Sequence, residues 1–204
     1  MKEKELTAAE SLKLIERTIE QSRRDVATAS AQPLLVWGGL VLSTSLIIWL
    51  LITNTPRGEG GGSWHLLWIL MTLIGGIYQY YFNRSWSVPD TIVSRTIGYM
   101  WGVFGISVFV LWAINICAIT FGGISVRQII PMTPTIILLM GLSVALTGLM
   151  MNRLFISIIG VVACAICAYF SLVNQGVNEL LCVAVTAVFT LIVPGLYLKF
   201  SNGR

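Results

Sequence analysis

The sequence predicts an all-α membrane protein: a bundle of six transmembrane helices preceded by an amphipathic helix on the cytoplasmic side. The 204 residues have a mean hydropathy of +0.83, and only 11% of them are charged, against about 25% in soluble domains. Twelve of the charged residues lie within the first 25 positions, and the others fall between or beyond long apolar runs. A charge at the bilayer centre costs about 2.5–3.5 kcal/mol on insertion scales, so this placement indicates a multi-span membrane protein.

The N-terminal segment is expected to form the one element outside the membrane. Thr7 and Glu10 have the spacing of a capping box at the start of a helix. A helical apolar stripe follows, formed by Leu12, Ile15, Ile19 and Val26. Gln32-Pro33 is expected to end this helix and to start the first span, since proline is tolerated in a first helical turn. The sequence therefore predicts two parts, a cytoplasmic helix in residues 1–32 and a transmembrane domain in residues 33–204.

Six apolar runs are long enough to cross a hydrocarbon core of about 30 Å, which requires about 20 helical residues. They cover residues 34–53, 64–82, 97–121, 135–151, 154–173 and 180–198. The runs are continuously apolar, whereas the strands of a membrane barrel alternate in polarity. The glycine-rich stretch 54–63 is expected to be a loop, and Asn152-Arg153 is so short that spans four and five must form a tight antiparallel hairpin.

The distribution of basic residues predicts the orientation. If both termini are cytoplasmic, eleven Lys and Arg residues lie inside and only Arg57 and Arg127 lie outside. This bias follows the positive-inside rule, and an even number of spans returns the chain to its starting side. The same rule explains the net charge of +4. The sequence has no basic patch interleaved with aromatic residues, which would indicate nucleic-acid binding.

Small residues recur at helical spacing on three of the predicted spans. Such faces let two helix backbones approach closely, either within one bundle or between two copies. The residues are Gly98, Gly102 and Gly105 on the third span, Gly141 and Ala145 on the fourth, and Gly160 and Cys164 on the fifth. Cys164 also forms a CxxC motif with Cys167. A thiol oxidoreductase needs an accessible, activated thiolate, and the position of this pair in the middle of a span favours packing.

Polar groups that could perform chemistry are scarce. His65 is the only histidine, and a metal site needs several convergent ligands. No phosphate-binding loop or dinucleotide fingerprint is present, so no cofactor, metal or catalytic residue is predicted. Gln79 and Asn115 are the most polar residues in the mid-to-inner parts of the spans. They would either line a cavity for a neutral or apolar solute or form hydrogen bonds between helices.

Three stretches together resemble a group of uncharacterised multi-pass membrane proteins of Bacteroidota. They are the segment from Glu10 to Arg23, the sequence Pro33-Leu34-Leu35-Val36-Trp37-Gly38, and the sequence Ile97-Gly98-Tyr99-Met100-Trp101-Gly102-Val103-Phe104-Gly105. The resemblance covers most of the chain. It implies a bacterial inner membrane, and it transfers no catalytic residue.

The functional prediction rests on the contrast between a bundle in which no catalytic residue is predicted and a charged N-terminal helix. We expect a non-enzymatic membrane protein whose N-terminal helix docks on the lipid surface, on a protein partner or on a second copy. Leu14 widens the apolar stripe beyond a coiled-coil seam, which favours docking on a surface. A transporter or pore for a neutral solute and a membrane thiol oxidoreductase are the alternatives.

Overall fold

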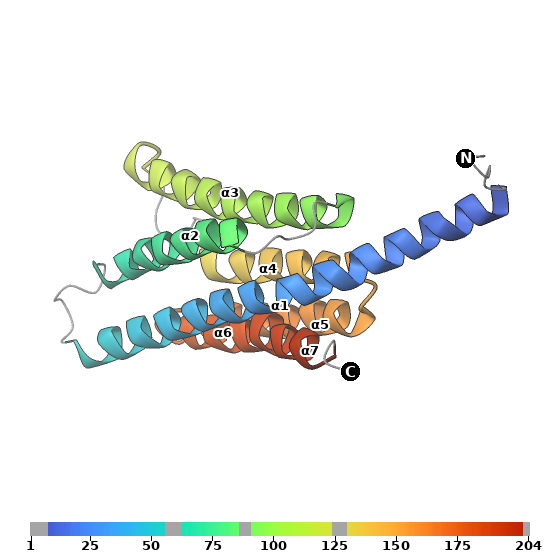
Figure 1. Cartoon of the computed structure of the whole chain (residues 1–204). Coiled ribbons are helices and arrows are strands. Elements are labelled where there is room, and N and C mark those ends of the chain that lie inside the picture. The colour runs from blue at the N-terminus through green and yellow to red at the C-terminus, as the bar shows by residue number, and fades with distance from the viewer. Residues whose placement is uncertain (1–7, 56–62, 86–90, 124–129, 202–204) are drawn as a thin grey trace.

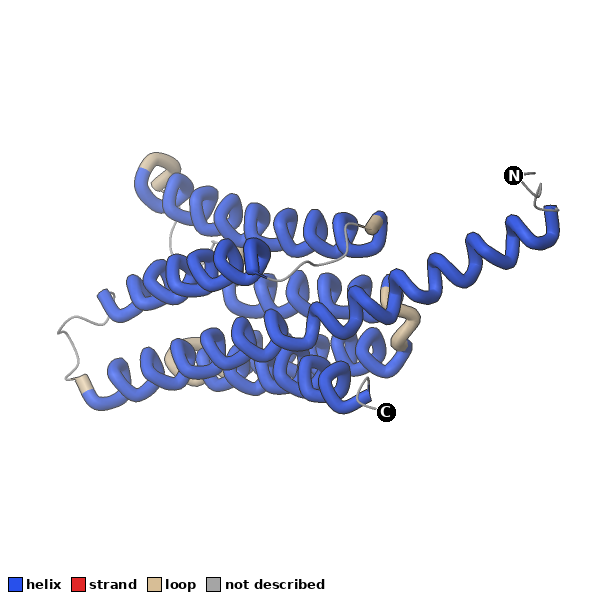
Figure 2. Tube along the Cα trace, viewed as in Figure 1, coloured by secondary structure: helices blue, strands red, loops and turns tan. Residues whose placement is uncertain are grey.

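The computed structural model describes residues 8–55, 63–85, 91–123 and 130–201, and all of its regular elements are helical. They are α1 (Ala8–Asn54), the 3₁₀ turn η1 (Ser63–Leu66), α2 (Leu67–Ser85), α3 (Ile92–Thr120), α4 (Met132–Met150), α5 (Leu154–Val173), α6 (Glu179–Ala187), the π-helical segment η3 (Val188–Ile192) and α7 (Val193–Ser201). Because α6, η3 and α7 follow one another without a break, the described residues form six long helices (Figure 1, Figure 2).

Five of these helices are long and apolar enough to cross a membrane: α1, α3, α4, α5 and the continuous helix α6–η3–α7. The sequence predicted six such spans. The second predicted span, residues 64–82, falls on η1 and α2, and α2 is not among the five. The second half of α2 carries Gln79, three tyrosines and Arg84, which lower its mean hydropathy.

The predicted break between an amphipathic helix and a first span is wrong. α1 is one helix of 47 residues, it continues through Pro33, and it is apolar as a whole. At a rise of 1.5 Å per residue it is about 70 Å long, more than twice the thickness of a hydrocarbon core. Proline is tolerated here because packing on both sides of it holds the helix together: Ala31 and Leu34 are both buried in the bundle. Thr7, the predicted cap, lies outside the described residues.

Successive helices run in opposite directions, so the start of α1 and the end of α7 lie at the same end of the bundle (Figure 1). Whether the two termini share a side of the membrane, and which compartment that side faces, stays a prediction. α1 packs against α6, η3, α7 and α2, while α4 and α5 form the tightest pair. α3 packs on α4 and, more lightly, on α1, and it keeps only Ile97, Leu111 and Asn115 buried.

α4 and α5 form the tight antiparallel hairpin that the short linker predicts. Asn152 adopts a left-handed conformation with φ of 56°, which asparagine tolerates better than most residues. The backbone N–H of Arg153 donates to the carbonyl of Gly148 at 2.8 Å. This pattern is that of a Schellman-type helix end, in which a left-handed residue lets the following amide satisfy a free carbonyl.

α1 approaches the last helix closely at two glycines. A Cβ on Gly38 would lie 2.9 Å from Cβ of Leu191, in η3, and a Cβ on Gly195 would lie 2.8 Å from the Leu35 side chain. In η3 the N–H of Val193 donates to the carbonyl of Val188, five residues earlier, which is π-helical geometry. These contacts bury the middle of α1 in the core of the protein.

Candidate functional site

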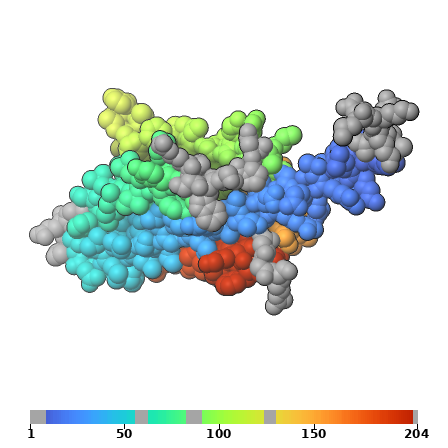
Figure 3. Space-filling model, in the orientation of Figure 1, coloured from blue at the N-terminus to red at the C-terminus, as the bar shows by residue number. Residues whose placement is uncertain are grey.

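The first part of α1 leaves the end of the bundle and projects from it (Figure 1, Figure 3). We call residues 8–25 the arm. Four large apolar side chains of the arm are exposed: Leu12, Leu14, Ile15 and Ile19. Three of these were predicted as docking residues from their spacing, and the structure places them on the part of α1 that no other described helix covers.

Val26, the fourth predicted docking residue, is not available for docking. It is 2% exposed, and with Ala27 it belongs to the main hydrophobic cluster of the bundle, together with Ile97 of α3 and Leu198 of α7. Helical spacing placed Val26 on the apolar stripe but could not show where the bundle ends. Val26 and Ala27 therefore anchor the arm to the bundle.

The charged side chains at the base of the arm differ in their partners. Arg24 Nη2 lies 3.2 Å from Glu20 Oε1, and Gln21 Nε2 donates to Asp25 Oδ1 at 2.9 Å. In contrast, Arg23 Nε and Ser22 Oγ are buried and have no hydrogen-bond partner among the described residues. Buried polar atoms are nearly always hydrogen-bonded, so these two atoms at the base of the arm are exceptions.

Gln79 and Asn115 each form a hydrogen bond within the bundle. Trp37 Nε1 donates to Gln79 Oε1 at 3.4 Å, which links α1 to α2. Asn115 Nδ2 donates to the carbonyl of Ile130 at 3.0 Å, which ties the segment before α4 to α3. The contact of Gln79 is the predicted hydrogen bond between helices, whereas Asn115 bonds to the segment before α4 and not to another helix.

The small-residue faces of α4 and α5 meet. A Cβ on Gly141 would collide with Cys164, whose Sγ would lie 2.6 Å away, and a Cβ on Gly160 would lie 3.3 Å from the backbone N of Ala145. Ser157 Oγ donates to the carbonyl of Ala145 at 2.8 Å. Cys164 therefore fills space beside a glycine. It is buried, as is Cys167.

The corresponding face of α3 has no such neighbour. A Cβ added to Gly98, Gly102 or Gly105 would meet no atom of the described residues within 4 Å. The sequence pattern was the same as on α4 and α5, but only the fold decides which small-residue faces are paired.

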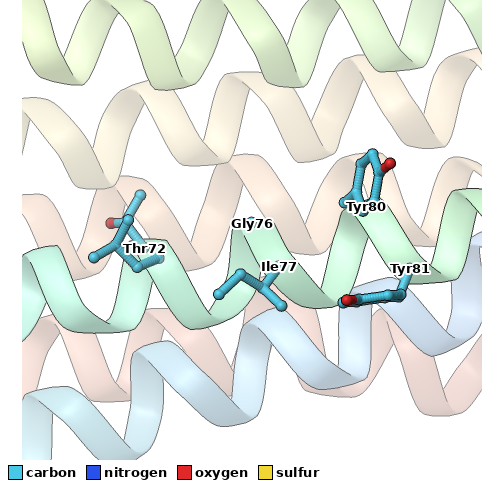
Figure 4. A pocket seen from close by; sticks show the side chains of 6 residues that line it. Thr72, Gly76, Ile77, Tyr80 and Tyr81 are labelled. Atoms are coloured by element: carbon cyan, nitrogen blue, oxygen red, sulfur yellow. The ribbon is translucent and has the colours of Figure 1, made fainter.

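The best-defined hollows on the described surface are shallow. One lies along α2 and is lined by Thr72, Gly76, Ile77, Tyr80 and Tyr81 (Figure 4), with Leu73 beside them. A second lies between α3 and α4. Neither hollow includes Gln79 or Asn115 in its lining. No group of three metal-ligating side chains converges within the described residues.

Sequence reasoning missed the contact that positions α2 against α1. The ring of Trp37 occupies the space where a Cβ on Gly75 would lie, and the same ring donates to Gln79 one helical turn further on. Gly75-Gly76 within an apolar run was the available signal, since glycine in a membrane helix allows close approach. The identity of its partner depends on the fold.

No protein-family model matches the chain, and neither a curated protein nor a solved structure matches it. The chain is an integral membrane protein of multi-pass helical type, on the length and composition of its helices. The resemblance to membrane proteins of Bacteroidota stays a hypothesis, as does the bacterial inner membrane that it implies.

Proposed function

We propose that the protein is a non-enzymatic membrane anchor that presents the arm to a protein partner on the cytoplasmic side of a bacterial inner membrane. The observation that carries this proposal is the continuity of α1. The same helix is buried in the bundle at Val26 and Ala27 and exposes Leu12, Ile15 and Ile19 beyond it. The bundle thus holds a rigid arm whose apolar stripe is exposed outside it.

The geometry favours a protein over the lipid surface as the occupant of the stripe. Leu12 precedes Leu34, the start of the first predicted span, by 22 residues, which is about 33 Å along the helix axis. An interfacial helix buries its apolar face only about 5–10 Å into the bilayer boundary and lies in its plane. Because α1 is packed on the bundle on both sides of Pro33, the arm cannot bend down at the proline without losing core contacts.

Exposed apolar side chains in water favour association. Burying a Leu or Ile side chain contributes about 1.5–3 kcal/mol, so covering three of them supplies a substantial part of a specific interaction. Helical anchors spaced by three and four residues are the pattern of helix-to-helix or helix-in-groove recognition.

The proposal is tested by the accessibility of single cysteines on the arm. Ile15→Cys places a thiol on the stripe, and Arg17→Cys places one on the opposite face as the matched control. Their reaction rates with a membrane-impermeant maleimide are compared in native membranes, in proteoliposomes of purified protein and in detergent. Cys117 is exposed near the end of α3, so both variants also carry Cys117→Ser, and the reagent then reports the introduced thiols.

Each result has a definite meaning. Protection of Ile15→Cys in native membranes alone, with Arg17→Cys reacting equally everywhere, supports a protein partner. Protection in proteoliposomes as well would mean that lipid or a second copy covers the stripe. Equal reactivity of both positions in all three preparations would show that the arm is free and would overturn the proposal.

A further inference from the structure

The last helix contains a π-helical turn, η3, and Pro194 follows that turn closely in the buried core. In a regular α-helix, the N–H of residue 194 would bond to the carbonyl of Thr190. Proline has no N–H, and its ring would clash with that carbonyl. In the wider π turn the N–H of Val193 bonds instead to the carbonyl of Val188, which is five residues back. We therefore attribute η3 to Pro194.

α1 packs directly on this irregular turn. A Cβ on Gly38 would lie 2.7 Å from Ile192 Cγ1 and 3.2 Å from the backbone N of Ile192. The second of these atoms is backbone, so no change of rotamer could relieve the contact. The neighbouring Gly39 is different, because a Cβ there would meet no atom of the described residues within 4 Å. The position of the turn thus fixes the position of α1 at Gly38.

The last helix follows α1 from Gly38 to the base of the arm (Figure 1). A Cβ on Gly195 would lie 3.2 Å from the carbonyl oxygen of Ala31. One turn further on, Leu198 is fully buried in the same hydrophobic cluster as Val26. Because α1 is one continuous helix, a displacement at Gly38 is transmitted along it to the arm.

We propose that η3 sets the direction of the arm: Pro194 requires the π turn, and the turn holds α1 in place through the contact of Ile192 with Gly38. This inference concerns where the arm points and does not depend on what the arm binds. Ala31 lies seven residues from Gly38 and fourteen from Arg17. If α1 pivots at Ala31, a displacement of about 1 Å at Gly38 therefore moves Arg17 by about 2 Å in the opposite direction.

The test measures the distance between the arm and the bundle by double electron–electron resonance on the full chain in nanodiscs. Spin labels are attached at Arg17→Cys on the arm and at Leu154→Cys, an exposed position at the start of α5. Cys117→Ser removes the exposed native thiol. Gly38→Ala and Pro194→Ala should each shift the mean distance by about 2 Å or more. Gly39→Ala, the matched control, should leave it unchanged.

A double-mutant cycle tests the link between Pro194 and Gly38. Gly38→Ala alone should lower Tm by roughly 2–12 °C, on the scales for overpacking and for chain size. In the Pro194→Ala chain, residue 194 can bond to the carbonyl of Thr190 and the turn can become α-helical, so Gly38→Ala should cost less than half as much.

Two results would overturn the proposal. The first is an arm distance that stays the same in both Gly38→Ala and Pro194→Ala, or that shifts equally in Gly39→Ala. The second is an equal loss of Tm from Gly38→Ala with and without Pro194→Ala, which would show that the turn does not depend on the proline. If Gly38→Ala alone does not fold, the distance in Pro194→Ala decides. The maleimide protection of Ile15→Cys tests the docking function separately, so either idea can fail without the other.

Discussion

Gly141 is the position where one methyl group should reveal how closely α4 and α5 are packed. A Cβ at this position would collide with Cβ of Cys164, lie 2.6 Å from its Sγ and lie 2.9 Å from the carbonyl oxygen of Gly160. Two of these three neighbours belong to a short side chain and the third is backbone, so none can move away cheaply. Overpacking of this kind costs about 1–3 kcal/mol.

The expected result of Gly141→Ala is therefore a loss of thermal stability. For a chain of this size, a loss of 1 kcal/mol lowers Tm by about 2–4 °C, as calibrated on soluble domains. Tm of the purified protein in detergent, followed by tryptophan fluorescence, should fall by roughly 2–12 °C on these two scales. Cys164→Gly in the same chain should recover part of the loss, since it removes two of the three collisions.

Gly102→Ala on α3 is the matched control, because a Cβ there meets nothing within 4 Å. It should leave Tm unchanged or raise it slightly, since alanine is the better helix former. If both substitutions lower Tm equally, or if Cys164→Gly gives no recovery, the close contact between α4 and α5 is not what limits stability and the reasoning fails.

Three further outcomes follow from single contacts. Asn115→Leu removes the donor to the carbonyl of Ile130, and a hydrogen bond contributes about 0.5–1.5 kcal/mol net, so Tm should fall by a few degrees; an unchanged Tm would mean that the bond is not maintained. Ser157→Ala removes the bond to the carbonyl of Ala145, and interhelical bonds in membranes average about 0.6 kcal/mol, so only a small drop in Tm is expected, and a drop as large as that of Gly141→Ala would contradict this ranking. Pro33→Ala should leave helix content by circular dichroism unchanged, because α1 is already continuous there; a gain in helicity would show that the proline interrupts α1.

Local sequence patterns predicted the hairpin of α4 and α5 and the bounds of α5 because these features depend on short-range constraints. An apolar run must be about 20 residues long to span hydrocarbon, and a two-residue linker can only join antiparallel neighbours. The same reasoning overestimated the apolar character of residues 64–82, because the polar residues after Gly76 lower the hydropathy of α2. It also placed a helix end at Pro33. The preference of proline for a first helical turn can be read from the local sequence, whereas the packing of Ala31 and Leu34 that keeps α1 continuous depends on distant residues.

The candidate site was predicted in part. Leu12, Ile15 and Ile19 could be identified from periodicity, since an apolar stripe on a charged helix is visible in the sequence. Val26 has the same spacing, and only the fold shows that the bundle covers it. Arg23 gave no signal in the sequence, because its neighbours include charged residues of both signs and the burial of its Nε is a property of packing.

By itself, the sequence determined that lipid surrounds most of this chain, that its helices are long and apolar, and that its charges gather at one end. These properties depend on the free energy of moving side chains and backbone from water to hydrocarbon. Each segment makes that transfer largely on its own, so its local sequence is sufficient to predict the outcome. Only the tertiary structure decided that α1 is unbroken, that the glycines of α4 and α5 are paired while those of α3 are open, and that the apolar stripe continues beyond the part of α1 that the bundle covers. These outcomes depend on which side chains meet across long separations in the sequence, and that is set by the packing of the whole bundle.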